Sequence, residues 1–128
     1  IYLAALRNKM MQLASEIADG AIWANASRKS IASQIAQIPE SKRSNMFLAN
    51  MIPTVISPDV QAARAVHRKT LIGYVTLPNY RNYWRACGYT EQVDAFEKIL
   101  KSSTKESRDT EIVSAMDNEW LDDCTISG

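Results

Sequence analysis

A short polar corner near the start of the chain holds the residues best suited to binding a ligand. Arg7, Asn8 and Lys9 follow the apolar residues 1–6 and precede a helical pattern. A helix N-terminus carries about half a positive charge and unpaired N–H donors, so it attracts phosphate. Asn8 is a suitable N-cap, and the charge of Lys9 opposes the helix dipole unless an anion binds. The corner therefore predicts either an anion site or two simply solvated cations.

The corner belongs to an expected strand–helix–strand unit over residues 1–25. Residues 1–6 and 21–25 are short apolar runs, which are typical of strands in a parallel sheet with helices on both faces. Between these runs, apolar residues from Met10 to Ile17 recur at helical spacing. Asp19 and Gly20 are expected to end this helix.

Further elements continue the alternation of strands and helices. Ser27 is expected to cap the second helix, and Ser57 followed by Pro58 to begin another. The third strand contains Pro53, which lacks an N–H and therefore belongs at a bulge or at the strand's end. The expected strands cover 1–6, 21–25, 46–56 and 124–127. The expected helices cover 28–38, 58–77, 79–85 and 91–101, with one or two more in 109–123, and residues 40–45 and 102–108 are expected to be loops.

These segments resemble one enzyme family. The segment IYLAALRNKMMQLASEIADGAIWANA resembles the middle of the barrel in luciferase-like flavin or deazaflavin oxidoreductases. NMIPTVI, LPNYRNYWRACGY and WLDDCTISG resemble later parts of the same family in the same order. The resemblance covers nearly the whole chain and is least distinctive near 102–108. It implies an α/β fold, a partial (β/α)8 TIM barrel of the bacterial luciferase-like type.

The resemblance also implies a cofactor, FMN or coenzyme F420, at the C-terminal ends of the strands. Ala5, Leu6, Arg7 and Asn8 would line its phosphate, with Met10 in the adjoining turn. Many members of the family have Gly-Pro where this chain has Arg7-Asn8, and here the Arg7 guanidinium could make a bidentate contact instead. The implied activity is that of an oxidoreductase or monooxygenase acting on a small organic substrate. The cofactor supplies most of that chemistry, and no catalytic residue is assigned.

Several other residues leave alternatives open. The carboxyl ends of barrel strands face the active site, and Trp23 and Asn25 would alternate to one side of their strand. Both would then point into the barrel mouth, or Trp23 packs in the core and Asn25 opens a loop. Asn50 could face the cofactor ring or be a satisfied core residue. We interpret His67 as non-catalytic, and the aromatic segment 79–85 as a substrate cover, a subunit interface or plain packing.

The length of the chain limits the expected domain. A complete (β/α)8 barrel has roughly 250 residues, whereas this chain has 128. We therefore expect one partial domain over 1–128, the C-terminal portion of a barrel without its N-terminal strands and its extreme C-terminus. Such a segment should neither fold stably nor catalyse alone, because its strand edges and core are exposed. The alternative is a complete small α/β domain.

Composition excludes several classes of function. The chain is 46% hydrophobic and 23% charged with a net charge of +1, and it contains no nucleic-acid motif, signal peptide or membrane-length apolar run. Residues 1–90 carry eleven Lys/Arg against four Asp/Glu, and residues 91–128 carry four against ten. Cys87 and Cys124 have neither metal-ligand nor disulfide spacing. We therefore expect a cytoplasmic protein without a metal and without nucleic-acid or membrane partners. The family resemblance further implies a small-molecule substrate and, for the full-length protein, a homo-oligomer, namely a dimer.

Two other functions fit the same residues. One is a lyase or isomerase on a similar barrel that binds a phosphorylated substrate at the Arg7 corner without a flavin. The other is a non-catalytic binding module that uses the basic first part of the chain. Binding of FMN or F420 separates both from the implied oxidoreductase.

Overall fold

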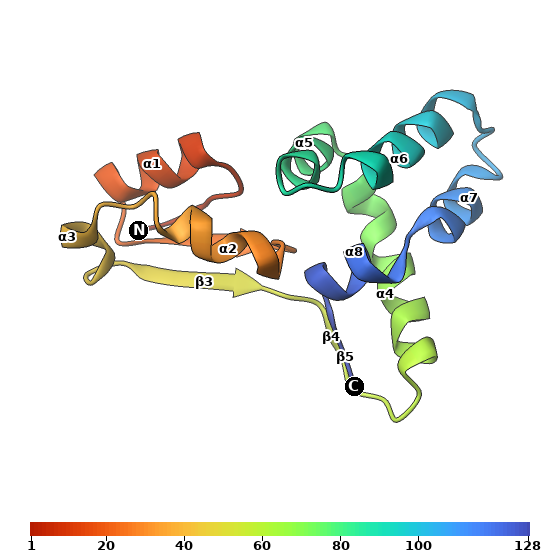
Figure 1. The fold of residues 1–128 in the computed structure, drawn as a ribbon, viewed down its shortest axis with the longest axis horizontal. Coiled ribbons are helices and arrows are strands. Elements are labelled where there is room, and N and C mark those ends of the chain that lie inside the picture. Colours follow the sequence, from red (N-terminus) through yellow and green to blue (C-terminus); the bar gives the residue numbers. More distant parts are fainter. The chain divides into compact units, whose positions relative to one another are not determined.

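The computed structural model describes residues 1–128, which form two compact units, Ile1–Ile52 and Pro53–Gly128 (Figure 1). That both units belong to one partial barrel domain stays a prediction. The first unit contains β1 (Tyr2–Ala4), α1 (Asn8–Ile17), β2 (Gly20–Ala24), α2 (Arg28–Ile35), α3 (Glu40–Arg43) and β3 (Phe47–Met51). The second contains β4 (Thr54–Val55), α4 (Val60–Val75), α5 (Pro78–Ala86), α6 (Thr90–Ser102), α7 (Arg108–Ala115), α8 (Asn118–Cys124) and β5 (Ile126–Ser127).

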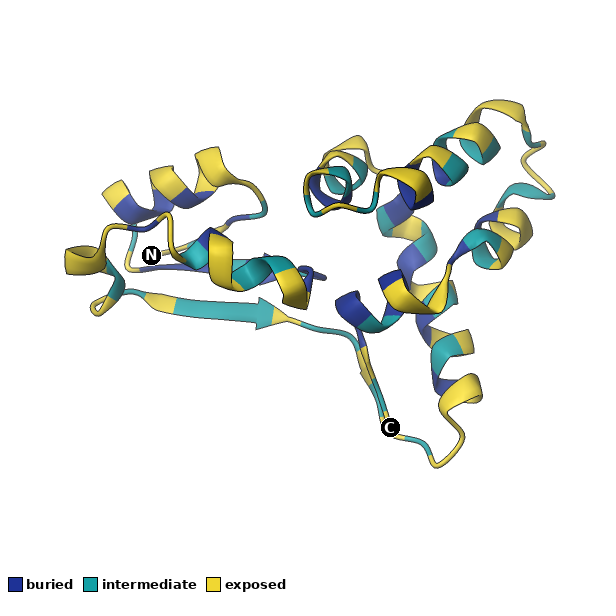
Figure 2. Cartoon of the chain, in the orientation of Figure 1, coloured by how far each residue is buried: buried dark blue, intermediate teal, exposed yellow.

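The first unit is a parallel sheet with strand order β1-β2-β3 and helices along one side (Figure 1). This confirms the strand–helix–strand unit expected at the start of the chain. Met11, Ala14 and Ser15 of α1 are buried, and Figure 2 shows the buried part of α1 on its side toward the sheet. Trp23 of β2 also points to the helices, since its indole Nε1 donates to Gln34 of α2 at 2.8 Å.

The opposite face of this sheet departs from the expectation. Tyr2, Gly20 and Phe47 lie side by side in the register of the three strands. The rings of Tyr2 and Phe47 have centroids 5.2 Å apart, yet these residues are 57% and 53% exposed. Helices within this unit therefore cover one face of the sheet, whereas the apolar strand sequences predicted helices on both faces.

The second unit is built around an aromatic core. The ring of Trp120 lies 4.8 Å from that of Trp84 and 5.3 Å from that of Phe96, edge to face in both pairs. All three side chains are fully buried. They belong to α8, α5 and α6, so one cluster joins three helices. Edge-to-face pairs add about 0.5–1.5 kcal/mol each to the stabilisation from burial.

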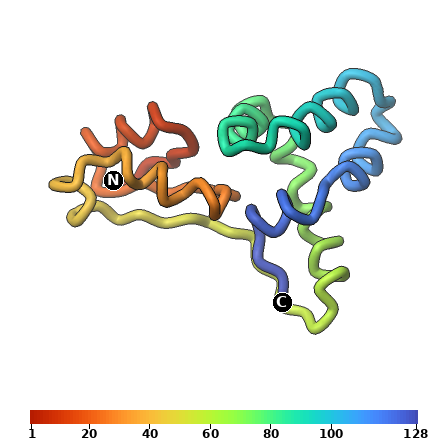
Figure 3. The backbone as a smooth tube through the Cα atoms, viewed as in Figure 1, coloured from red at the N-terminus to blue at the C-terminus, as the bar shows by residue number.

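Helix α4 holds the last strand and helix of this unit. Arg64 makes a bidentate contact with the carboxylate of Asp122 at 2.9 and 2.5 Å. One turn later, the buried His67 has its Nε2 2.9 Å from the carbonyl oxygen of Ile126 in β5. Strands β4 and β5 are parallel and run side by side in the trace of Figure 3. His67 thus has a structural partner, in keeping with its non-catalytic interpretation.

Several boundaries differ from the expectation. Helix α2 ends at Ile35 and not at Ile38, and Cys124, expected to begin the last strand, ends α8. The strand expected over 46–56 is two strands, β3 and β4, because Pro53 interrupts the pairing and β4 joins a second sheet with β5. The loop expected over 40–45 contains the short helix α3. Helix α4 is capped by Asp59, not Ser57, and the Asp59 carboxylate accepts from the N–H groups of Gln61 and Ala62 at 2.9 and 3.0 Å. Ser27 caps α2 as expected.

Gln92 connects α6 to the turn between α7 and α8. Its Nε2 donates to the carbonyl oxygen of Ala115 at 2.7 Å, and its Oε1 accepts from the N–H of Asp117 at 2.9 Å. We expect Gln92→Leu to lower the free energy of unfolding by about 2–4 kcal/mol, since two backbone groups lose their partner. Urea denaturation measures this. Gln61→Leu on the exposed start of α4 is the control, and equal stability of both variants would contradict the prediction.

No helix in the chain has the length and apolar character needed to cross a membrane.

Candidate functional site: the corner after the first strand

The corner predicted to bind a phosphate lies at the carboxyl end of β1. Ala5 is buried and its N–H donates to the carbonyl oxygen of Ile22 in β2 at 2.9 Å, so it extends the pairing of the two strands. Leu6 is half-buried, and the chain then turns into α1 at Asn8. The corner is therefore fixed to the sheet on one side and opens to solvent on the other.

The first turn of α1 leaves backbone donors available. Arg7, not Asn8 as expected, is the N-cap; its φ of −131° and ψ of 163° are extended, and its side chain makes no capping hydrogen bond. The Arg7 carbonyl accepts from the N–H groups of Met10 and Met11 at 2.9 and 3.0 Å. The N–H groups of Asn8 and Lys9 have no partner in the structure. Two free donors at a helix N-terminus suit an anion.

The charges around this turn have the same sign. Arg7 and Lys9 are exposed and form no ion pair, and the first turn of α1 has no acidic residue. An uncompensated pair of cations at the positive end of a helix is unfavourable alone and favourable beside a phosphate. The residues present therefore fit a phosphate group.

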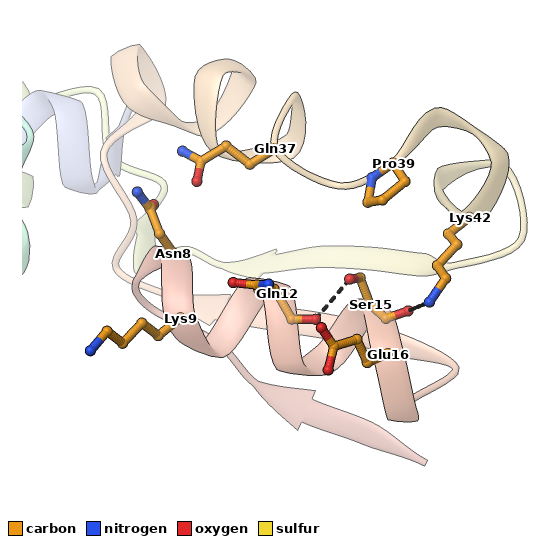
Figure 4. Close-up of a pocket in the computed structure, with 8 residues that line it drawn as sticks. All are labelled: Asn8, Lys9, Gln12, Ser15, Glu16, Gln37, Pro39 and Lys42. Atoms are coloured by element: carbon orange, nitrogen blue, oxygen red, sulfur yellow. Dashed lines mark hydrogen bonds between the residues drawn. The ribbon is translucent and has the colours of Figure 1, made fainter.

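A groove of about 310 Å³ runs along α1 (Figure 4). Its lining residues are Asn8, Lys9, Gln12, Ser15, Glu16, Gln37, Pro39 and Lys42. At its far end Lys42 Nζ donates to the carbonyl oxygen of Ser15 at 2.8 Å, which caps the last turn of α1. Figure 4 shows the Asn8 and Gln37 side chains extending toward each other, whereas Lys9 extends away from the other residues.

The structure places the predicted site residues as follows. Ala5 to Asn8 form the corner and Met10 lies in the first turn of α1; of these five residues only Asn8 lines the groove. That they bind a cofactor phosphate stays a prediction. The groove also contains Gln37 and Lys42, which sequence analysis did not select. Nothing in the sequence around these two residues indicates that they lie against α1.

Two asparagines mark the carboxyl ends of the neighbouring strands. Asn25 follows β2 with a φ of 52°, and its N–H donates to the carbonyl oxygen of Met51 at 3.0 Å. Asn50 in β3 accepts from the N–H of Ala26 at 3.3 Å. Trp23 is buried and bonded to α2, so it packs in the core and does not enter a barrel mouth.

The aromatic segment after α4 has a packing role. Tyr83 and Trp84 are buried in the second unit. The charged residues beside them pair with α6: Arg85 contacts Asp94 at 2.6 Å and Glu97 at 3.3 Å. Of the three alternatives for residues 79–85, plain packing accounts for these contacts.

The functional groups at the corner are suited to binding anions. No group of His, Cys, Asp or Glu residues is arranged to hold a metal ion. At the corner, the functional groups are N–H donors, a guanidinium, an ammonium and an amide, which bind anions but do not abstract protons at neutral pH.

Comparison with known proteins gives a structural match. No protein-family profile and no curated protein matches the sequence. The structure of the coenzyme F420-dependent tetrahydromethanopterin reductase from Methanopyrus kandleri superposes with a TM-score of 0.72 over 99% of this chain at 19% sequence identity. The chain has the fold of part of this reductase. It spans 37% of the reductase chain.

The match supports the expected fold class. Both expected features of the architecture, parallel strands and intervening helices, are present. The strands form a sheet of three and a sheet of two, and neither closes into a barrel. At 19% identity the similarity shows the fold alone, since one fold hosts many functions.

Proposed function

We propose that the protein containing this chain is an oxidoreductase that uses coenzyme F420, with FMN as the alternative cofactor, and acts on a small organic substrate. The observation that carries the proposal is the structural similarity to an F420-dependent reductase over 99% of the chain. The ordered sequence resemblance to luciferase-like oxidoreductases supports the same function independently of the structure. The monooxygenase activity of some such enzymes is the alternative reaction.

The residues of the corner would hold the phosphate of the cofactor. The free N–H groups of Asn8 and Lys9 and the Arg7 guanidinium are the donors that suit it. When bound, the flavin-type ring supplies hydride chemistry. The chain's own part in the reaction is to bind and orient that cofactor at the carboxyl edge of the sheet, where ligands of α/β folds bind.

Cofactor binding tests the proposal. We expect the purified protein containing this chain to bind F420 or FMN, seen as a change in the fluorescence or absorbance of the cofactor on titration. A folded protein that binds neither cofactor would contradict the proposal. Binding of inorganic phosphate without either cofactor would instead favour the lyase or isomerase with a phosphorylated substrate. Absence of all three would favour the binding module.

The assembly and location of the protein are part of the same proposal. A homodimer without nucleic-acid or membrane partners, located in the cytoplasm, agrees with the family that the sequence resembles. Gel filtration of the purified protein measures the assembly.

A further inference from the structure

Asn25 combines two unfavourable features in one residue. Its φ of 52° places it in the left-handed region, and it is the one non-glycine residue of the chain with a positive φ. Its side chain is 1% exposed, and its Nδ2 has no hydrogen-bond partner. Strained backbone and a buried unpaired donor both cost free energy, and such costs concentrate at functional sites.

Neighbouring groups hold this conformation in place. The N–H of Asn25 donates to the Met51 carbonyl at 3.0 Å, and the next N–H, that of Ala26, donates to Asn50 Oδ1 at 3.3 Å. Ser27 then caps α2 by accepting from the N–H of Ser30 at 3.3 Å. The backbone on both sides of Asn25 is therefore determined by the sheet and the helix, and the residue cannot relax without breaking one of these bonds.

A turn of this shape does not itself require asparagine. Glycine adopts a positive φ without strain and would leave no buried donor unpaired. Asparagine tolerates the conformation better than most residues, but its amide then needs a hydrogen-bond acceptor. Asn50 of β3, whose Oδ1 accepts from the N–H of Ala26, adds a second buried Nδ2 without a partner. The two amides are neutral donors, unlike the cations at the Arg7 corner.

The position of Asn25 indicates which molecule could supply the acceptor. It follows the carboxyl end of β2, and β2 pairs with β1 up to the hydrogen bond between Ala5 and Ile22. Asn25 thus lies on the same edge of the sheet as the Arg7 corner, one strand away. Parallel strands are about 4.8 Å apart, so one cofactor-sized molecule can span both positions.

We propose that Asn25 is a ligand-binding residue whose side-chain amide donates to a neutral carbonyl oxygen of the molecule bound at the Arg7 corner. The inference rests on the proposed function, in which that molecule is a flavin-type cofactor with ring carbonyl groups. Asn50 is a positioning residue, because it holds the N–H that follows Asn25. Burial excludes water from the amide and so strengthens a hydrogen bond made there.

Two substitutions at Asn25 separate ligand binding from a role in the turn. Asn25→Gly removes the amide and the backbone strain; we expect an unchanged or higher melting temperature, together with binding of F420 or FMN weakened roughly 3- to 10-fold. Asn25→Asp replaces the donor by an acceptor of similar shape and should weaken binding roughly 10-fold or more. Asn82→Asp, on the exposed side of α5, is the control for the added charge.

A spectroscopic measurement reports on the amide directly. In protein labelled with ¹⁵N at asparagine, the side-chain amide signal of Asn25 is the one that Asn25→Gly removes. We expect it to shift on addition of F420 or FMN. If the parent protein binds a cofactor while both variants bind equally well and the signal stays in place, the inference is wrong and the proposed function stands. A parent protein that binds neither cofactor overturns both.

Discussion

Gly20→Ala is expected to destabilise the first unit strongly. A Cβ at this position would overlap the carbonyl oxygen of Phe47, and would lie 2.9 Å from both Phe47 Cβ and Tyr2 Cδ1. The obstructing carbonyl is backbone of the neighbouring strand, so the sheet itself must shift. We expect the free energy of unfolding to fall by about 3 kcal/mol, at the upper end of the range for overpacking. Denaturation followed by circular dichroism measures it.

A second glycine provides the control. Gly73 lies in the middle of α4, and a Cβ there meets nothing within 4 Å. Gly73→Ala should therefore stabilise the protein by about 0.5–1 kcal/mol, since alanine has the higher helix propensity. If Gly20→Ala proves as stable as the parent protein, the strands around Gly20 can move apart at little cost, and the prediction is wrong.

Gly20 also shows which features of the fold the sequence predicts and which it does not. The sequence predicts that the first helix ends near Gly20, and α1 does end at Ile17. Gly20 has a second role that the sequence does not indicate, because it is the first residue of β2 and makes room for Tyr2 and Phe47. The helical spacing of apolar residues depends only on neighbouring residues, so it can be recognised in the sequence. The requirement for a residue without a Cβ arises only when β1, β2 and β3 come together around Gly20.

The third strand illustrates the same limit. Apolar residues over 46–56 and Pro53 were visible in the sequence, and the proline does lie where the pairing ends. β3 pairs with β2, whereas β4 pairs with β5, whose residues lie some seventy positions further along the chain. Local composition carries no information about that choice. The cap at Asp59 was missed for a different reason, since Ser57 and Asp59 both present acceptors two residues apart.

The candidate site was predictable in part. A polar corner after an apolar strand is visible in the sequence, and the structure places Arg7 and Asn8 at a helix N-terminus as expected. Asn25 was recognised only as a polar residue at a strand end. Its positive φ and unpaired amide depend on Met51 and Asn50, which come from a distant part of the chain. Residues whose role depends on backbone strain are those that sequence patterns identify least well.

Arg7→Ala is expected to weaken cofactor binding about ten- to a hundredfold. If the corner holds a phosphate dianion, the guanidinium adds a charge-assisted contact worth about 1.5–3 kcal/mol, which converts to that change in affinity. The exposed Arg7 side chain has no protein partner, so its removal should leave the melting temperature nearly unchanged. Titration of F420 and FMN into parent and variant measures the effect.

The contact with the phosphate can be separated from general electrostatic attraction. Lys69→Ala removes a positive charge from the exposed side of α4 without removing a residue of the corner, and it should change the affinity less than twofold, because solvent and salt screen an exposed charge that makes no direct contact with the phosphate. Turnover at saturating cofactor should also change little in Arg7→Ala, since a phosphate contact lies away from the reacting ring. If Arg7→Ala binds the cofactor as Lys69→Ala does, Arg7 is a solvated surface residue. The free N–H groups of Asn8 and Lys9 would then hold the phosphate without it.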